Sequence, residues 1–230
     1  MGVCARDLVP LPAPRPHALS QVPPPLNLTS LARPDLLLVT PILRSASTTL
    51  MHLLRLLAPH RGFSFTPRQR RRAEFVHIPD PKIQDLETCL ANPRDIECKY
   101  VAGSKTLGHT TEFFCGHHDY CPVFGDREGL AAAKEGVERG WAVVGVLEEW
   151  SKTLEVLENY VPRFFIGAKQ LYYGHIHRNK TLRNENFYRP NVEEAAKEAL
   201  KKVFEVEYEF YQFVKQRLDK QYHALASVGV

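Results

Sequence analysis

The sequence lacks a hydrophobic run of transmembrane length and lacks the glycines of a nucleotide-binding P-loop. A membrane-spanning helix needs about 20 consecutive apolar residues, and no apolar run here reaches that length. The pattern GxxxxGK[ST], whose backbone cradles phosphates, is absent, and no acidic residue clearly ends a strand where it could hold magnesium. These absences disfavour a P-loop phosphotransferase, and they leave this sequence without an evident membrane anchor.

Cysteine is scarce, and four of the five cysteines fall in two close pairs: Cys89 with Cys98, and Cys115 with Cys121. Zinc sites usually combine CxxC or CxxxxC with a second such pair or with HxxxH. The spacings here differ, and the adjacent His117 and His118 cannot easily both face one ion. The pairs therefore favour two small disulfide loops over a metal site, and they indicate an oxidising compartment. Cys4 is left over.

The N-terminal region is rich in proline, and we expect residues 1–34 to form a flexible leader. Asn27 and Asn179 each begin a glycosylation sequon, which favours a luminal or secreted setting. No signal peptide is recognisable. Either the N-terminus is incomplete or atypical, or the compartment argument is wrong. The formal net charge is +4, with arginines concentrated at residues 68–72. That run is either a solvated loop or a contact for an anionic polymer.

The hydrophobic pattern predicts buried strands separated by helices. Leu36–Val39 and Trp141–Leu147 are continuous apolar runs, typical of buried parallel strands. Helical spacing over Thr48–Leu57 predicts a helix that Pro59 closes. A second helix is expected over Asp126–Arg139, ending near Gly140. We therefore expect an α/β fold with a parallel sheet flanked by helices, and an incomplete sheet because the chain is short of strands.

The C-terminal half predicts further helices. Ser151 can cap a helix that points Leu154 inward, and residues 161–173 are expected to be helical beyond Pro162. A long helical region then extends from about residue 190 to Leu225. Its inward stripe comprises Leu200, Phe204, Tyr208, Tyr211, Leu218 and Tyr222. The folded domain is thus expected over residues 35–226.

The loop after the first expected strand carries the candidate chemistry. A strand that enters a helix through a tight turn points backbone N–H groups and the helix dipole at one spot, which suits a phosphate. This loop carries one cation, Arg44, and four hydroxyls: Ser45, Ser47, Thr48 and Thr49. An arginine can grip phosphate with two parallel hydrogen bonds. The alternative is that Ser47 or Thr48 merely caps the helix.

Several segments, in order, resemble the uronyl and heparan sulfate 2-O-sulfotransferases, in particular their Pipe-like branch. They are the loop RSASTT, the cysteine-rich Phe113–Cys121, Ala142–Glu149, Val161–Ala168 and Glu207–Leu218. The resemblance implies a P-loop-like sulfotransferase fold and transfer of a sulfo group from 3′-phosphoadenosine 5′-phosphosulfate, without a metal. The acceptor would be the 2-hydroxyl of a uronic acid in a glycosaminoglycan such as heparan sulfate.

The resemblance also assigns roles to residues. Arg44, Ser45, Ala46, Ser47, Thr48 and Thr49 take the place of the loop that binds the 5′-phosphosulfate. Arg44 stands where the family has a lysine that stabilises the leaving group, so we assign it the catalytic role. Arg178 lies in a loop that closes over the nucleotide. Cys89 with Cys98, and Cys115 with Cys121, match the family's two disulfides.

The resemblance has a gap. Residues 58–88 are too few to hold the family's catalytic histidine and the strand end that binds the 3′-phosphate. His60 and His77 are the histidines left there as substitutes. Family members are usually Golgi membrane proteins, so a Golgi location is expected, with a membrane anchor not present in this chain. The partners are a glycosaminoglycan and no nucleic acid, and a homo-oligomer is permitted. The alternative is an inactive relative that binds anionic polysaccharide or a partner protein.

Overall fold

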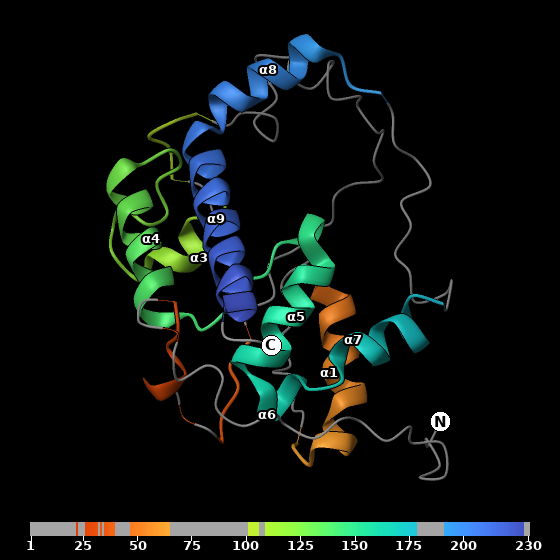
Figure 1. Cartoon of the computed structure of the whole chain (residues 1–230). Helices are drawn as coiled ribbons and strands as arrows, with labels where there is room; N and C mark the ends of the chain where they lie inside the picture. Colours follow the sequence, from red (N-terminus) through yellow and green to blue (C-terminus); the bar gives the residue numbers. More distant parts are fainter. Residues whose placement is uncertain are drawn as a thin grey trace. The chain divides into compact units, whose positions relative to one another are not determined.

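The computed structural model describes Val22 and residues 26–31, 33, 35–39, 47–64, 101–105, 109–178 and 191–227. The chain divides into two compact units. Unit 1 comprises Met1–Phe65, Lys134–Asn184 and Tyr211–Val230, and unit 2 comprises Thr66–Ala133 and Glu185–Phe210. Helices α4 (Arg127–Gly140) and α9 (Glu205–Ser227), both labelled in Figure 1, each contribute residues to both units.

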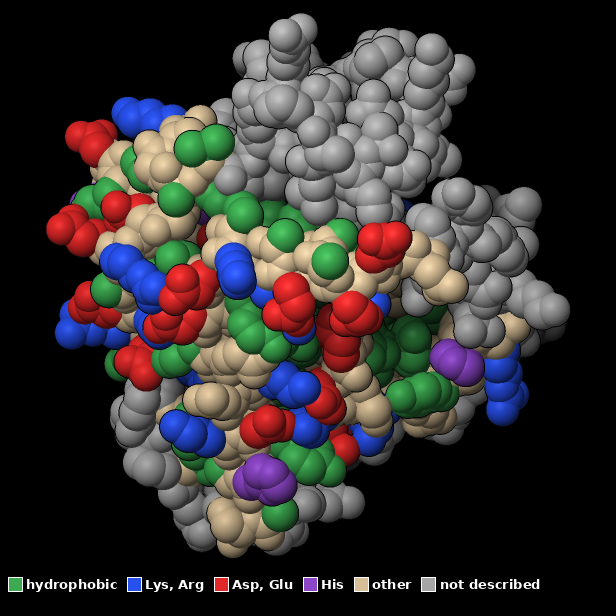
Figure 2. All heavy atoms as spheres, turned by 90° about the horizontal axis from the view of Figure 1, so that it is seen from above, with side chains coloured by type: hydrophobic (Ala, Val, Ile, Leu, Met, Phe, Trp, Pro, Cys, Tyr) green, Lys and Arg blue, Asp and Glu red, His purple; other side chains and the backbone are tan. Residues whose placement is uncertain are grey.

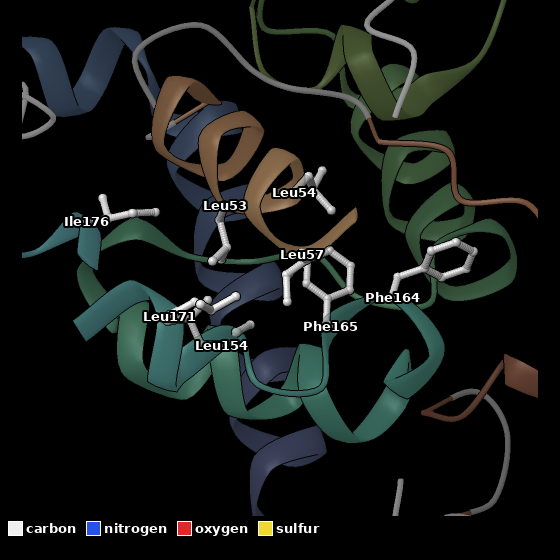
Figure 3. Close-up of a cluster of buried hydrophobic side chains, with 9 residues drawn as sticks. Leu53, Leu54, Leu57, Leu154, Phe164, Phe165, Leu171 and Ile176 are labelled. Atoms are coloured by element: carbon white, nitrogen blue, oxygen red, sulfur yellow. The ribbon is translucent and has the colours of Figure 1, made fainter. Parts of the chain in front are cut away.

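Unit 1 is built on a layer of helices packed around buried leucines and phenylalanines. The layer consists of α1 (Ser47–Arg61), α5 (Trp150–Tyr160), α6 (Pro162–Phe165), α7 (Ala168–Leu171) and the one-turn π-helix η6 (Tyr172–Ile176). Helix α1 contacts α6, α7 and η6, and α5 contacts α6 and α7. The shared core is Leu53, Leu54, Leu57, Leu154, Phe164, Phe165, Ala168, Leu171 and Ile176 (Figure 3). Burying each large side chain contributes about 1.5–3 kcal/mol.

Helix α1 forms where the leucine spacing predicts it, but the prediction that Pro59 closes it is wrong. The helix continues through Pro59 to Arg61. Pro59 lies on the exposed side, where water can reach the carbonyl that its missing N–H leaves unbonded. The end comes at Gly62, whose φ of 64° is left-handed, and the Phe63 N–H donates to the Ala58 carbonyl at 3.2 Å. Glycine here forms a Schellman-type C-cap.

The described residues contain no β-strand, so the predicted parallel sheet is not confirmed. They hold one isolated antiparallel bridge, between Lys105 and Val123. Leu36 and Leu38 are 62% and 79% exposed, while Leu37 and Val39 pack against the core of unit 1. This segment thus buries one side, whereas a strand inside a parallel sheet buries both.

The second predicted strand is an extended segment whose backbone is bonded by side chains. The Thr153 hydroxyl of α5 accepts the Val146 N–H at 3.0 Å and donates to the Val146 carbonyl at 3.1 Å. The Gln221 side-chain amide of α9 donates to the Ala142 carbonyl at 2.8 Å. Side chains thus form hydrogen bonds with backbone groups that would bond a neighbouring strand in a sheet.

The predicted second helix is confirmed as α4. The Asp126 carboxylate accepts the Gly129 N–H at 2.7 Å and caps its start. The prediction that Ser151 caps the next helix is wrong, because α5 begins one residue earlier, at Trp150. A single 3-10 turn, η5 (Leu147–Glu149), leads directly into α5. No side-chain hydrogen bond caps the start of either helix. Leu154 faces inward as predicted.

The two later helical regions are confirmed but interrupted. Gly167, with a left-handed φ of 86°, separates α6 from α7. The C-terminal region breaks at Phe204 into α8 (Glu194–Val203) and α9. The break shifts the inward face, so Tyr208 is 51% exposed and not part of a core stripe. The buried apolar residues of α9 are Val206, Phe210, Val214, Leu218 and Leu225.

Unit 2 holds the short helix α3 (Glu112–Cys115), which a disulfide between Cys115 and Cys121 closes onto the following loop. The Thr111 N–H and hydroxyl donate to the buried Glu207 carboxylate at 3.1 and 2.6 Å. These two hydrogen bonds satisfy a carboxylate that would otherwise be costly to bury.

Removing the Thr153 hydroxyl tests the anchoring of the extended segment. Thr153→Val keeps the shape of the side chain but leaves the buried Val146 N–H without its acceptor. We expect the free energy of unfolding to fall by about 1–3 kcal/mol, measured by denaturant titration. Thr153→Ser keeps the hydroxyl and should lose less. Equal losses in the two variants would contradict the anchoring role.

Glu158 of α5 gives unit 1 a pH dependence of defined sign. Its carboxylate accepts the Lys169 N–H at 2.8 Å, yet burial raises the pKa of Glu158 above its ordinary value of 4.5. A raised pKa means stability that is present at acid pH and lost as the pH rises through that pKa. The glutamine of the Glu158→Gln variant does not titrate. The free energy of unfolding of this variant, relative to that of the native chain, should therefore increase from about pH 4 to pH 7.

Glu194 provides the opposite control. A hydrogen bond from Lys197 lowers the pKa of Glu194. The small contribution of this carboxylate to the stability of the protein is therefore lost as the pH falls. The melting temperatures of Glu158→Gln and Glu194→Gln should therefore shift relative to the native chain in opposite directions between these pH values. A pH-independent difference for Glu158→Gln would refute the assignment.

Candidate functional site

The first turn of α1 is the described part of the predicted phosphate loop. Arg44, Ser45 and Ala46 lie outside the described residues, and Ser47 is the first residue of the helix. Thr48 is exposed and Thr49 is half-buried. The first turn carries no acidic residue, so nothing in it opposes an anion at the positive end of the helix dipole. Three buried leucines hold the helix from its inner side.

The π-helix η6 brings Arg178 to the same helical layer. Ile176 is 2% exposed and belongs to the core cluster, and η6 contacts α1. In Figure 3, Ile176 lies on the side of the cluster nearer Leu53, away from Phe164. Phe164 packs against Phe63, just beyond the C-terminal end of α1. The end of η6 thus lies toward the N-terminal half of α1, with Arg178 exposed two residues later.

Aromatic rings gather around Tyr172, the first residue of η6. Tyr172 contacts Trp150 at 5.6 Å, Tyr173 at 5.0 Å and His177 at 5.9 Å between ring centroids. Tyr173 is 40% exposed. Single π-helical turns occur often at functional sites, and this one places an open aromatic face close in sequence to a cation. The arrangement can stack a planar or ring-shaped group beside an anion.

His52 and His60 of α1 lie at different distances from the predicted phosphate loop. His60 lies twelve residues beyond Thr48 on the same helix, about 18 Å along its axis. It therefore lies far from the first turn of α1, which disfavours it as the group that accepts a proton there. His77 lies outside the described residues. His52, which the sequence reasoning missed, follows Thr48 by one helical turn and is half-buried. The signal was its i, i+4 spacing from Thr48.

A shallow pocket elsewhere in unit 1 is unsuited to a phosphorylated donor. It is lined by residues 148–152, Glu155 and Tyr222 and has a volume of about 260 Å³. Its one cation, Lys152, is bonded to Asp219, and this contact raises the pKa of the lysine. Lys152 also lies 3.3 Å from Glu149. The surrounding carboxylates would repel an anion.

The remaining predicted positions are only partly described. Cys89, Cys98, Cys4, Asn179 and the arginines of residues 68–72 lie outside the described residues. Asn27 is half-buried, and its side-chain oxygen accepts the Thr29 N–H at 3.0 Å. Among the described residues, no group of three or more His, Cys, Asp or Glu side chains is placed to hold a metal ion. No helix there is long and apolar enough to cross a membrane.

Similarity to characterised proteins extends along nearly the whole chain. The uronyl 2-sulfotransferase homolog pip of Drosophila melanogaster is 32% identical over 226 residues, which cover 94% of this chain and 43% of that protein. The human uronyl 2-sulfotransferase is 28% identical over 160 residues, covering 70% and 35%. The human heparan sulfate 2-O-sulfotransferase 1 is 34% identical over 127 residues, covering 53% and 35%.

No protein-family model matches the chain. The chain spans less than half the length of each of these relatives. All three relatives are named as 2-sulfotransferases or as a homologue of one. The chain is a homologue of the uronyl and heparan sulfate 2-O-sulfotransferases.

Proposed function

We propose that this protein transfers a sulfo group from 3′-phosphoadenosine 5′-phosphosulfate to the 2-hydroxyl of a uronic acid residue in a glycosaminoglycan. The observation that carries the proposal is the 32% identity to a uronyl 2-sulfotransferase homolog over 94% of this chain. The heparan sulfate enzymes among the relatives support a polysaccharide acceptor. We place the reaction in the Golgi lumen, as the resemblance implies.

The donor side of the reaction is assigned to residues 44–49 and Arg178. The donor supplies the activated sulfo group. Backbone N–H groups at the start of α1 and the Arg44 guanidinium hold the phosphate beside that group. The oxygen of the acceptor's 2-hydroxyl forms a bond to sulfur, and the bond between sulfur and the bridging phosphate oxygen breaks. Arg44 stabilises the negative charge that develops on the leaving 3′-phosphoadenosine 5′-phosphate.

The proton of the acceptor hydroxyl must pass to a base. His52 is the described histidine that lies one turn from Thr48, and helical side chains lean toward the N-terminus. Its imidazole therefore leans toward the turn that holds the donor. Residues 58–88 are too few to hold the catalytic histidine of the family. We therefore assign the proton-accepting role to His52.

Product analysis after sulfo transfer tests the proposal. The chain is incubated with 3′-phosphoadenosine 5′-phosphosulfate and heparan sulfate, and the product is digested to disaccharides to detect new 2-O-sulfated uronate. Arg44→Ala should lower kcat by about 10²–10³-fold, while Arg44→Lys should retain most activity because the charge remains. No 2-O-sulfated product from the native chain, or full activity in Arg44→Ala, would contradict the proposal.

The same assay separates the two histidines of α1. His52→Gln should lower kcat by about 10²–10⁴-fold, the usual effect of losing a general base. His60→Gln, at the far end of the same helix, should leave the rate unchanged. If His60→Gln lowers kcat as much as His52→Gln, the loss reflects damage to α1, and the assigned role of His52 is wrong.

A further inference from the structure

Two glutamates of α5 hold a single residue of the neighbouring helix α7. Glu155 and Glu158 are three residues apart, so they lie on the same face of α5. The Glu158 carboxylate accepts the backbone N–H of Lys169 at 2.8 Å, and the ammonium group of the same lysine donates to the Glu155 carboxylate at 2.8 Å. Both the main chain and the side chain of one residue are thus bonded to α5, and we call this arrangement the Lys169 clamp.

The clamp acts at the start of a helix that lacks a side-chain cap of its own. The first N–H groups of a helix have no acceptor within the helix, and Lys169 is the second residue of α7. The residue that precedes α7 is Gly167, which has no side chain to offer as an acceptor. The Glu158 carboxylate therefore takes the place of the cap that a serine or an aspartate would supply.

The segment that follows the clamp has little rigidity of its own. Helix α7 has 4 residues, whereas an isolated helix needs about 12–15 residues to be even marginally stable in water. Gly167 has a left-handed φ of 86°, and Gly174 lies within η6, where nothing lies within 4 Å of the position that a Cβ would take. Glycine leaves the backbone unusually free, so contacts from outside must fix the direction of this segment.

Hydrophobic contacts fix the inner side of the same segment. Leu171 and Ile176 are 3% and 2% exposed and belong to the core cluster of unit 1 (Figure 3). The His177 N–H donates to the Tyr172 carbonyl at 2.8 Å, which closes the π-helical turn. Arg178 follows directly and is exposed, so the direction of η6 determines where its guanidinium group lies.

Exposed ion pairs offer a contrast to the clamp. The face of the molecule drawn in Figure 2 shows acidic and basic side chains intermixed at the surface. On α8, Lys197 lies 2.6 Å from Glu194, and their side chains are 47% and 79% exposed; such pairs contribute little to stability. The side chains of Lys169 and Glu155 are 34% and 33% exposed, and Glu158 is half-buried. Moreover, the bond from Glu158 holds a backbone N–H, so it restrains the main chain directly.

We propose that Glu158, assisted by Glu155, is a positioning residue that sets the direction of η6 and thereby places Arg178 beside the donor. The two carboxylates act through the main chain of α7 and not by contact with the donor. The role at the donor rests on the proposed function, whereas the clamp rests on the two hydrogen bonds to Lys169.

Hydrogen–deuterium exchange without any ligand tests the clamp. In Glu158→Ala, the amides of Lys169 and His177 should exchange faster than in the native chain, because the first loses its acceptor and the second reports the loosened π-helical turn. Glu158→Gln keeps a side-chain oxygen that can accept the N–H, so it should restore most of the protection. The control Glu149→Ala removes a carboxylate that pairs with lysines of α5 and α9, and both amides should stay as slow as in the native chain.

Calorimetric titration with 3′-phosphoadenosine 5′-phosphate tests the consequence for the donor. Glu158→Ala should weaken the Kd by about tenfold, the effect of losing one charged hydrogen bond to phosphate. Because residues that act through one another are not additive, the double variant Glu158→Ala/Arg178→Ala should bind no more weakly than Arg178→Ala alone. Glu149→Ala should bind as tightly as the native chain.

Each result decides one part of the inference. Unchanged exchange in Glu158→Ala, or an equal loss of protection in Glu149→Ala, would overturn the clamp. Additive losses of affinity in the double variant would overturn the positioning of Arg178. A native chain that binds no nucleotide would contradict the proposed function and the role at the donor, while the exchange result still decides the clamp. Nucleotide binding without sulfo transfer would contradict only the proposed function.

Discussion

The packing of α1 against α6, α7 and η6 determines how this helix presents its first turn and its outer side. Leu53, Leu54 and Leu57 are at most 1% exposed, and they fix both the rotation and the position of the helix. That rotation decides which residues face outward, so it places Thr48, His52 and Arg55 on one open side. The same core holds Ile176 and thereby positions the segment that carries Arg178. A helix less firmly packed could not present its first turn in one orientation to a phosphate.

A second constraint is the anchoring of residues 141–146. Where a sheet would bond this segment through neighbouring strands, the structure bonds it through Thr153, Arg217 and Gln221. Arg217 donates to the Trp141 carbonyl at 3.2 Å, and Gln221 donates both to Ala142 and to the Leu26 carbonyl. Burial lowers the pKa of Arg217, so keeping this guanidinium charged inside the protein has an energetic cost. Removing Arg217 or Gln221 would leave part-buried carbonyls without these donors.

Local signals in the sequence predicted the helices well, whereas the described residues do not confirm the predicted sheet. The leucine spacing of α1 and the helical pattern of α4 depend on neighbours within a turn or two, so the sequence reveals both helices. The apolar runs at 36–39 and 141–147 predicted strands, but a strand exists only when distant segments pair with it, and periodicity does not report pairing. The roles of Thr153 and Gln221 were missed for the same reason, although polar residues at i, i+4 spacing on α9 (Arg217 and Gln221) were a visible signal. The donor loop followed from its residue types, whereas the position of His52 needed the helix.

The proposed reaction requires a rigidly packed α1 that presents its first turn to the phosphate of the donor. Hydrogen–deuterium exchange with and without 3′-phosphoadenosine 5′-phosphate tests it most directly, because exchange reports local opening residue by residue. We expect the amides of residues 53–57 to exchange slowly in both conditions, and those of residues 47–50 to become protected only when the nucleotide is added. Rapid exchange across residues 53–57, or protection by the nucleotide that leaves the first turn unchanged, would contradict it.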